Sequence, residues 1–370
     1  MFPREVVSAG PIVLRLPAEG DADAVTRACS DPEIARFIPL IPSPYTRSEA
    51  LEWITVVTPD AWKAGGAHFV IADRTTGEML GAIGLRPPNR YGDGEVGYWL
   101  APRARGRGVA TTALRALAGW AFAHGLARMT LRAEVENIAS QSVARRGGFA
   151  LEGVQRGAQA GRDGSRTDLA AFARLATDSG EPITPPLPFL PGGHPGGALT
   201  DGVVRLTPLT AADADAWHTL TNVPDVVRHR VPPRPITWTE ARERCRYAGH
   251  RWFAGQRADL AIRDAETGAL AGDIQLAGII PPLGQAMVGY SLHPGFRGRG
   301  LVTRAVNLLV EWAFANTSLG RIVAGTDPAN TASHRVLERA GFTREHLAKG
   351  LLPGPDGTRV DDLQWVRLRP

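Results

Sequence analysis

Hydrophobic residues recur at helical spacing in two stretches that lie far apart in the chain. In each stretch the apolar side chains fall on one stripe, with polar residues between them. The stripe of the first stretch is formed by Ala110, Ala113, Leu114, Leu117, Ala118 and Ala121. The stripe of the second is formed by Val302, Ala305, Val306, Leu309, Val310 and Ala313. Both patterns predict an amphipathic helix that packs on a sheet.

Apolar runs of strand length flank both helices. "HFVIAD", "MLGAIGL" and "EVGYWL" precede the first helix, and "LAIRD", "LAGDIQL" and "MVGYSL" precede the second. "MTLRAEV" and "IVAGT" follow them. Another helix is predicted from about Ser140 and from about Ser333, each ending at a glycine suited to a left-handed cap. A hairpin that turns at Asp163–Gly164 or Asp356–Gly357 closes each set of elements.

The two sets of elements are copies of one another. "RARGRGVATTALRALAGWAF" in the first set matches "GFRGRGLVTRAVNLLVEWAF" in the second, and "NIASQSVARRGGF" matches "NTASHRVLERAGF". The spacing between matching residues is nearly constant and far too long for a solenoid, so it indicates a duplicated domain. We predict a first domain over residues 1–178, a linker rich in proline and glycine over 179–198, and a second domain over 199–370.

Composition is that of an ordinary globular protein. The chain has 370 residues, 44% hydrophobic and 21% charged, which is enough for two cores. We expect no signal peptide, no membrane span and no nucleic-acid surface, because basic residues are scattered among 37 acidic ones. Cys29 and Cys245 lack metal-ligand spacing, which predicts buried thiols, no metal site and a cytoplasmic setting. The net charge of +5 favours an anionic cofactor.

An R-G-R-G loop joins a strand to the apolar-striped helix in both copies. Glycines let the backbone approach a ligand, and the unpaired amides of the next helix turn toward it at the positive end of the helix dipole. This combination predicts a socket for phosphate rather than a mere tight turn. A nucleotide-binding P-loop is excluded because no G-K-[ST] follows, and a dinucleotide fingerprint fits poorly because its third glycine is missing.

This loop and its surroundings resemble a known family. The strand "GYWL" followed by [RQ]-x-x-G-x-[GA] and a long helix is similar to the acyl-CoA loop of the GNAT acyltransferases. The wider set, with "DPEIARF", "NIASQSVARRGGF" and "FARL", resembles the branch that includes ribosomal-protein N-terminal acetyltransferases. The first copy has the motif residues Arg103, Gly106 and Gly108, whereas Gly295 stands where the second copy would have Arg or Gln.

The resemblance implies an α+β (α/β) fold class: two tandem GNAT folds, each with a mixed, split central sheet flanked by helices. It also implies acetyl-CoA, or another acyl-CoA, as co-substrate, with its pantetheine arm between the parting strands. The residues that it places at the co-substrate are Trp99, Leu100, Arg103, Arg105, Gly106, Arg107, Gly108, Val109, Ala110, Thr111 and Asn137 in the first copy, and Leu292, Arg297, Gly298, Arg299, Gly300, Leu301, Val302, Thr303 and Asn330 in the second.

The reaction implied is direct attack of a neutral amine on the thioester. It requires a base for the ammonium proton and a donor for the departing thiolate. The resemblance makes Ser140 and Ser333 the thiol-side donors, although serine in a first helical turn also serves as an N-cap. Glu95 is the candidate base, acting through water, and the alternative is a solvated strand carboxylate.

The copies differ where an acceptor would bind. Met287 replaces Glu95 in the second copy and cannot accept a proton, so Asp273 and Asp259 are candidates there. His68 aligns with Asp259, and a lone histidine is more often structural. The proline-rich loops of the two copies share little, and Trp99 aligns with a serine. Two acceptors, or one active and one degenerate half, are both compatible with this divergence.

Function is therefore predicted at the level of a reaction class. The leading hypothesis is an acetyl-CoA-dependent N-acyltransferase that acts on a small-molecule amine or a protein N-terminal amine. The alternative is a non-catalytic acyl-CoA-binding sensor or scaffold. The chain is expected to be a monomer or a homodimer.

Overall fold

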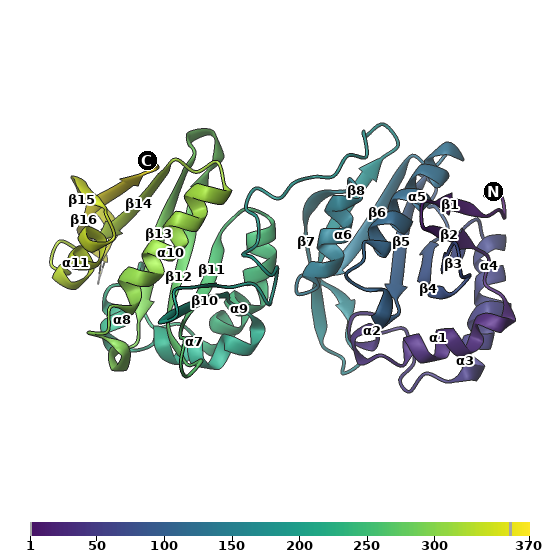
Figure 1. Ribbon diagram of the computed structural model, residues 1–370, viewed down its shortest axis with the longest axis horizontal. Helices are drawn as coiled ribbons and strands as arrows, with labels where there is room; N and C mark the ends of the chain where they lie inside the picture. The colour runs from purple at the N-terminus through teal and green to yellow at the C-terminus, as the bar shows by residue number, and fades with distance from the viewer. Residues whose placement is uncertain (1, 355–356) are drawn as a thin grey trace. The chain divides into compact units, whose positions relative to one another are not determined.

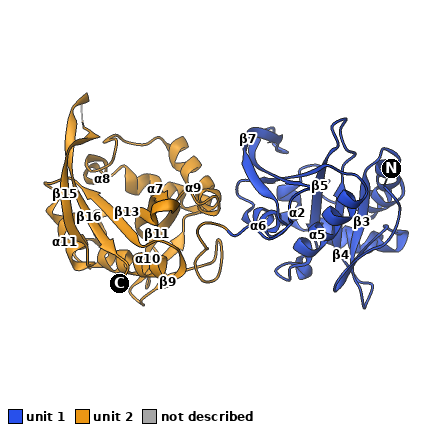
Figure 2. Ribbon diagram, turned by 90° about the horizontal axis from the view of Figure 1, so that it is seen from above, with its two compact units in different colours: residues 1–184 blue, residues 185–370 orange. Residues whose placement is uncertain are grey.

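The chain forms two separate compact units. The computed structural model describes residues 2–354 and 357–370, and its units comprise residues 1–184 and 185–370 (Figure 2). Within the described residues each unit contains one mixed sheet of eight strands flanked by helices (Figure 1), which confirms the predicted fold class. The turn predicted at Asp356–Gly357 lies partly outside the described residues. No helix of the described segments is both long and apolar enough to cross a membrane.

The first unit follows the predicted order of elements. Its strands and helices are β1 (Val7–Ala9), β2 (Ile12–Arg15), η1 (Glu19–Asp21), α1 (Ala22–Cys29), α2 (Pro32–Phe37), α3 (Arg47–Glu52), η2 (Trp53–Val57), α4 (Thr58–Lys63), β3 (Ala67–Asp73), β4 (Met79–Leu85), β5 (Asp93–Leu100), η3 (Pro102–Ala104), α5 (Val109–Ala123), β6 (Arg128–Glu134), α6 (Ile138–Arg146), β7 (Ala150–Ala160) and β8 (Arg166–Leu175).

The second unit repeats this order. Its elements are β9 (Leu199–Thr200), β10 (Val204–Pro208), η4 (Ala211–Asp213), α7 (Ala214–Thr221), α8 (Pro224–Arg228), α9 (Trp238–Phe253), β11 (Ala258–Asp264), β12 (Leu270–Ile280), η5 (Pro281–Leu283), β13 (Gln285–Leu292), η6 (Pro294–Phe296), α10 (Leu301–Asn316), β14 (Arg321–Thr326), α11 (Thr331–Arg339), β15 (Thr343–Pro353) and β16 (Arg359–Leu368).

The two sheets have the same topology. The strand order is β1-β2-β3-β4-β5-β6-β8-β7 in the first unit, and the equivalent order in the second is β9-β10-β11-β12-β13-β14-β16-β15. In each sheet one neighbouring pair is parallel, β5 with β6 and β13 with β14, and the other described pairs are antiparallel. A helix fills each parallel crossover, as a parallel connection requires.

Each sheet is covered on both faces. The predicted apolar stripes of α5 and α10 are buried against the sheet, and α6 and α11 lie beside them. The helices that precede β3 and β11 cover part of the opposite face, where Val70 and Trp99 pack against α1 and α3 (Figure 1). That opposite face is the one on which the two units differ most.

The segment between the units is anchored at both ends. The Ile183 backbone N–H donates to the carbonyl of Arg145 in the first unit. On the other side, Leu187 and Leu190 are buried in the core of the second unit, and the Trp252 indole donates to the Pro188 carbonyl at 3.0 Å. Part of the predicted linker therefore packs as core rather than as a free connector.

Candidate functional site

The R-G-R-G loops adopt the same backbone conformation in both units. Gly106 and Gly108 have φ of 72° and 77°, and Gly298 and Gly300 have 77° and 72°. These left-handed angles favour glycine. No heavy atom lies within 4 Å of where a Cβ at any of the four would be, so the space above each loop is open. The loop ends directly at the first turn of α5 or α10, whose amides have no intrahelical partners.

Carboxylates of neighbouring elements hold the arginines of these loops. Arg105 pairs with Asp31 at 2.5 Å, and Arg297 pairs with Asp225 at 2.9 Å. Arg299 pairs at 2.5 Å with Asp264, a buried residue at the end of β11. The guanidinium groups are thus positioned around the loop. The Arg297–Asp225 pair is exposed on both sides and adds little stability.

Arg103 has a different environment from the other loop arginines. Its guanidinium donates to Glu78 at 2.7 Å and to the Met79 carbonyl at 2.8 Å, which ties the loop to β4. A direct contact between Arg103 and the co-substrate stays a prediction. Gly295, the equivalent in the second unit, has no side chain and cannot form these hydrogen bonds.

Each parallel strand pair parts soon after it begins. In the first unit β5 pairs with β6 only from Asp93 to Val96, so Gly97–Leu100 has no partner on that side. In the second unit the pairing of β13 with β14 ends at Met287. Backbone N–H and C=O groups along these edges have no strand partner and can bind an extended chain, although the Leu100 carbonyl accepts from the Arg105 guanidinium at 3.3 Å. The unpaired segment leads directly into the R-G-R-G loop.

A tyrosine and a serine meet on the helix-covered side of each parting edge. The Tyr98 hydroxyl and Ser140 Oγ share a hydrogen bond of 2.9 Å, and the Tyr290 hydroxyl and Ser333 Oγ share one of 2.7 Å. Burial raises the pKa of Tyr98 above its usual range and the pKa of Tyr290 to about 12. Both phenols are therefore neutral proton donors at physiological pH.

The two serines are not the helix caps. The side-chain oxygen of Asn137 accepts from the Ser140 backbone N–H at 3.0 Å, and Asn330 accepts from Ser333 at 3.1 Å. The asparagines are thus the N-caps of α6 and α11, which leaves both serine hydroxyls for the tyrosines. The tyrosine partners were missed at the sequence level, although "GY" in both copies marked them.

Glu95 is held by two arginines on the face opposite Tyr98. Its carboxylate lies 2.6 Å from the Arg132 guanidinium on β6 and 3.4 Å from that of Arg86. Glu95 and Arg132 also border a cavity of about 260 Å³ between β5, β6, β7 and β8. The Glu95 carboxylate thus lies near the parting edge and forms ion pairs with both Arg132 and Arg86. Met287, at the same position in the second unit, projects into solvent.

The other candidate bases have firm partners. Asp273 is half-buried and accepts from Ser291 and, at 3.1 Å, from the Trp217 indole; desolvation of its carboxylate raises its pKa. Asp259 Oδ1 pairs with the Arg244 and Arg257 guanidinium groups at 2.7 and 3.1 Å, while its Oδ2 is buried without a hydrogen-bond partner among the described residues.

His68 lies away from the parting edge, on β3. Its ring is close to Gly84, where a Cβ would lie 2.8 Å from Cδ2, and burial together with Arg86 lowers its pKa. The imidazole is therefore neutral at physiological pH. A cysteine intermediate is also disfavoured, because burial raises the pKa of Cys29 and of Cys245 to about 12.

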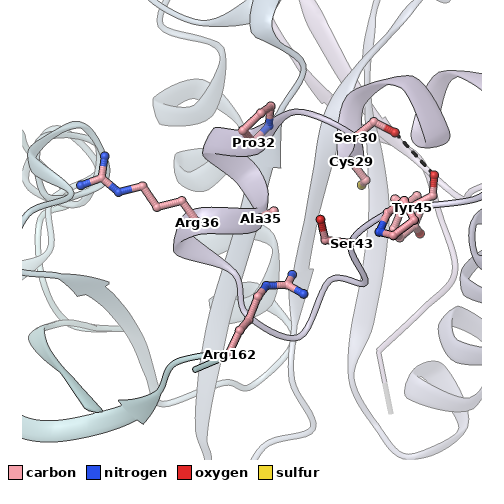
Figure 3. A pocket seen from close by; sticks show the side chains of 9 residues that line it. Cys29, Ser30, Pro32, Ala35, Arg36, Ser43, Tyr45 and Arg162 are labelled. Carbon is pink, nitrogen blue, oxygen red and sulfur yellow. Dashed lines mark hydrogen bonds between the residues drawn. The ribbon is translucent and has the colours of Figure 1, made fainter. Parts of the chain in front are cut away.

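The first unit has a cavity of about 600 Å³ beneath its proline-rich loop (Figure 3). Figure 3 shows the Arg162 guanidinium among the other labelled side chains, whereas Arg36 extends away from them. Arg162, from the β7–β8 turn, donates to the Ile41 carbonyl and so closes the loop over the cavity. The cavity is lined by Cys29, Ser30, Pro32, Ala35, Arg36, Ser43, Pro44, Tyr45 and Arg162.

Comparison with known proteins identifies the family. The family model described as an acetyltransferase (GNAT) domain matches residues 12–150 and again residues 204–343, more than half of the chain. The chain belongs to the GNAT acetyltransferases. This membership confirms the resemblance seen in the repeated motifs, and each unit carries one GNAT domain match.

Several curated GNAT proteins are similar to parts of the chain. "Probable N-acetyltransferase YjcK" of Bacillus subtilis (strain 168) is 43% identical over 89 residues, which cover 24% of this chain and 49% of that protein. The ribosomal-protein-serine acetyltransferase of Escherichia coli (strain K12) is 34% identical over 102 residues, which cover 26% of this chain and 55% of that protein. The chain thus spans about half the length of either relative.

Solved GNAT structures resemble one half of the chain. The ribosomal-protein-S5-alanine acetyltransferase of Vibrio fischeri has a TM-score of 0.43 and 23% identity over 46% of this chain and 96% of its own. RimL, a ribosomal L7/L12 alpha-N-protein acetyltransferase in complex with coenzyme A, has a TM-score of 0.43 and 22% identity over 46% of this chain and 98% of its own.

Proposed function

We propose that the chain is a cytoplasmic acyl-CoA-dependent N-acyltransferase that transfers an acetyl group from acetyl-CoA to a primary amine within a ternary complex. One observation carries this proposal. In each unit a strand with an unpaired edge runs directly into an open glycine loop at a helix N-terminus. The pantetheine arm of acyl-CoA, which ends in a diphosphate, fits this arrangement. The strand edge offers backbone hydrogen bonds to the arm, and the loop offers amide N–H groups to the diphosphate.

The proposal assigns the co-substrate residues as the sequence predicted them. The amides of residues 105–111 and 297–303 bind the pyrophosphate, with the loop arginines adding charge. The unpaired backbone of Gly97–Leu100, and of its counterpart in β13, pairs with the pantetheine arm. The open space above the glycines supports this assignment, because the co-substrate would meet no side chain there.

The chemistry follows from the groups on either side of the parting edge. In the first unit Glu95 takes the ammonium proton through water, since Arg132 and Arg86 keep its carboxylate close to the edge. The free amine then attacks the thioester carbonyl, forming the C–N bond as the C–S bond breaks. Ser140, hydrogen-bonded to the neutral Tyr98, donates a proton to the departing thiolate, and Ser333 with Tyr290 does so in the second unit.

The acceptor is proposed to be a protein N-terminal amine or a small-molecule amine. The name of the Escherichia coli relative supports the first, because that protein is a ribosomal-protein-serine acetyltransferase. The cavity beneath the first proline-rich loop could take a few residues of peptide. The differences around Trp99 and Ser291 favour different acceptors for the two halves.

Calorimetry and a thiol-release assay test the proposal. Titration of the intact protein with coenzyme A should show two sites per chain. Free thiol should then appear from acetyl-CoA when peptides with free α-amino groups are added. Binding without acylation of any amine in a broad panel would favour the acyl-CoA sensor instead, and no binding at all would reject both functions.

A further inference from the structure

The second unit has a buried carboxylate that no assigned role explains. Asp362, on β16, has only 4% of its surface exposed. Its Oδ2 accepts from the Gln364 side chain, while its Oδ1 is buried and has no hydrogen-bond partner among the described residues. A buried oxygen without a partner costs stability. The equivalent residue of the first unit is the apolar Leu169, so the fold itself does not require an acid at this position.

The strand register places Asp362 at the parting edge. The last pair between β13 and β14 is Met287 with Val323, so Gly325, two residues further, lies on the same face where the strands have separated. Gly325 pairs with Gln364, and side chains two residues apart on a strand share a face. Asp362 therefore lies on the face of Met287, the same face that carries Glu95 in the first unit.

Gly325 creates the space that the carboxylate occupies. A Cβ at Gly325 would lie 2.9 Å from Asp362 Cγ and 3.0 Å from Oδ1, so the carboxyl group rests directly on this glycine. Gly325 is itself exposed, because its strand has lost its partner there. The equivalent of Gly325 in the first unit is Arg132, which pairs with Glu95.

The two units thus carry an acid on the same face but on different strands. In the first, the parting edge carries Glu95 on β5 and Arg132 on β6. In the second, Met287 removes the acid and Gly325 removes the arginine, and the space is filled by an acid from the neighbouring strand β16. Met287 and Gly325 each remove a charged group that the first unit has, and Asp362 in place of Leu169 returns a carboxylate to the same face.

We propose that Asp362 is the catalytic base of the second unit, accepting the ammonium proton of the acceptor amine at Oδ1. The proposal rests on the N-acyltransferase function proposed above. The amine then attacks the thioester carbonyl, the C–N bond forms as the C–S bond breaks, and the thiolate takes a proton from Ser333. The second proton of the attacking nitrogen leaves to solvent as the amide forms, so the products are the amide and coenzyme A.

The environment of Asp362 suits a base at neutral pH. Burial, aided by repulsion from Asp327, raises its pKa to about 6, and the Gln364 hydrogen bond opposes that rise. Asp327 is the charged neighbour that raises this pKa, and the His229 imidazole lies 3.6 Å from Asp327. The register of β15 with β16 also places His346 opposite Gln364, two residues from Asp362. A carboxylate with a pKa near the working pH transfers protons efficiently in both directions. By contrast, Asp273 accepts from Ser291 and Trp217, and Asp259, whose Oδ2 also lacks a partner among the described residues, is held by two guanidinium groups at Oδ1.

The test isolates the second unit within the full chain. Gly106→Trp blocks the first loop, and calorimetry with coenzyme A should then show one site per chain. Acetyl-CoA turnover is measured in this background with short peptides that carry free α-amino groups, and with hydroxylamine. Hydroxylamine is a surrogate acceptor that is largely unprotonated at neutral pH and so needs no base to lose an ammonium proton.

Asp362→Asn in this background should lower kcat with peptide acceptors about 100-fold or more, as expected for loss of a general base. The KM for acetyl-CoA and the rate with hydroxylamine should stay within about twofold of the parent, since neither depends on ammonium deprotonation. The acidic limb of the parent pH–rate profile, near pH 6, should disappear. Asp361→Asn is the matched control, because this neighbouring acid points to the other face and accepts from the Gly350 N–H.

Two further variants keep the test independent of folding. Gly325→Ala should displace the carboxylate and lower kcat about 10-fold while the acid is retained. Met287→Glu added to Asp362→Asn should recover part of the lost activity, because it returns an acid to the Glu95 position. Unchanged thermal unfolding of Asp362→Asn would show that the loss is chemical.

Each outcome separates the two proposals. If the Gly106→Trp protein binds no coenzyme A, both proposals fail for the second unit. If it binds and turns over peptides equally well with and without Asp362, the base assignment is wrong and the acyltransferase function stands. If it binds but acetylates neither peptides nor hydroxylamine, while the Gly298→Trp protein does, the second unit is a binding copy and Asp362 is not a base.

Discussion

The two halves are alike where a co-substrate would bind and different where an acceptor would approach. The φ angles of the loop glycines repeat to within 5°, and the Tyr–Ser hydrogen bonds differ by 0.2 Å, from 2.9 to 2.7 Å. On the opposite face, Glu95 and Trp99 of the first unit are replaced by Met287 and Ser291. The duplicated halves thus keep the geometry proposed for a shared ligand, whereas the groups proposed to select and deprotonate an acceptor have diverged.

The largest effect should come from blocking one loop at a time. Gly106→Trp and Gly298→Trp each place a large side chain on a left-handed backbone position and into the open space above the loop. Each should reduce coenzyme A binding from two sites to one, as measured by calorimetry. We expect Gly106→Trp to remove the larger share of turnover, because Glu95 stays accessible at the edge. Loss of both sites in either variant would contradict independent halves.

Next in size is loss of the thiol-side donor. Ser140→Ala in the Gly298→Trp protein, and Ser333→Ala in the Gly106→Trp protein, should each lower kcat about 100-fold with little change in KM for acetyl-CoA. The paired measurement compares the same group in both halves. A loss in only one half would mean that the repeated Tyr–Ser hydrogen bond serves structure in the other.

A smaller effect is expected from the acceptor side of the first unit. Trp99→Ser gives the first unit the residue found in the second, and it removes a ring that packs against the buried cluster of α1 and α3, on which Ile41 and Tyr45 of the proline-rich loop also pack. We expect KM for peptide acceptors to rise about 10-fold while coenzyme A affinity is unchanged. Steady-state kinetics in the Gly298→Trp background measure this, and an equal loss of coenzyme A affinity would place Trp99 at the co-substrate instead.

The smallest effect concerns stability and pH. Because burial raises the pKa of Asp273, folded protein holds this proton at pH values where the unfolded chain, with a pKa of about 3.9, has lost it. The contribution of this group to stability is therefore greatest at low pH and falls as pH rises above about 4. The asparagine side chain of Asp273→Asn cannot titrate. The unfolding temperature of this variant should therefore rise relative to that of the parent between pH 4 and pH 7. Scanning calorimetry at several pH values measures both proteins. If Asp273 were instead ionised in the folded state, the difference between the two unfolding temperatures would stay constant over this pH range.

Much of the fold could be predicted because local patterns and the repeat agree. The apolar stripe of α5 fixed its buried face, and Gly148 and Gly341 do adopt the left-handed angles expected after α6 and α11. The tyrosine contacts could not be predicted, because they depend on which strand lies beside which helix. The role proposed for Asp362 could not be predicted for the same reason. It depends on the contact with Gly325, and only the pairing of β14 with β16 places these two residues side by side.

The anchored segment between the units also determines how the halves can be dissected. A protein that starts at residue 199, at the predicted domain boundary, would lack Leu187 and Leu190 and the carbonyl that Trp252 uses. Truncating a buried leucine to alanine costs about 2–5 kcal/mol, so deleting two of them could exceed the stability of a domain of this size. A second half expressed alone should therefore begin near Pro185, and a failed shorter version would say nothing about catalysis.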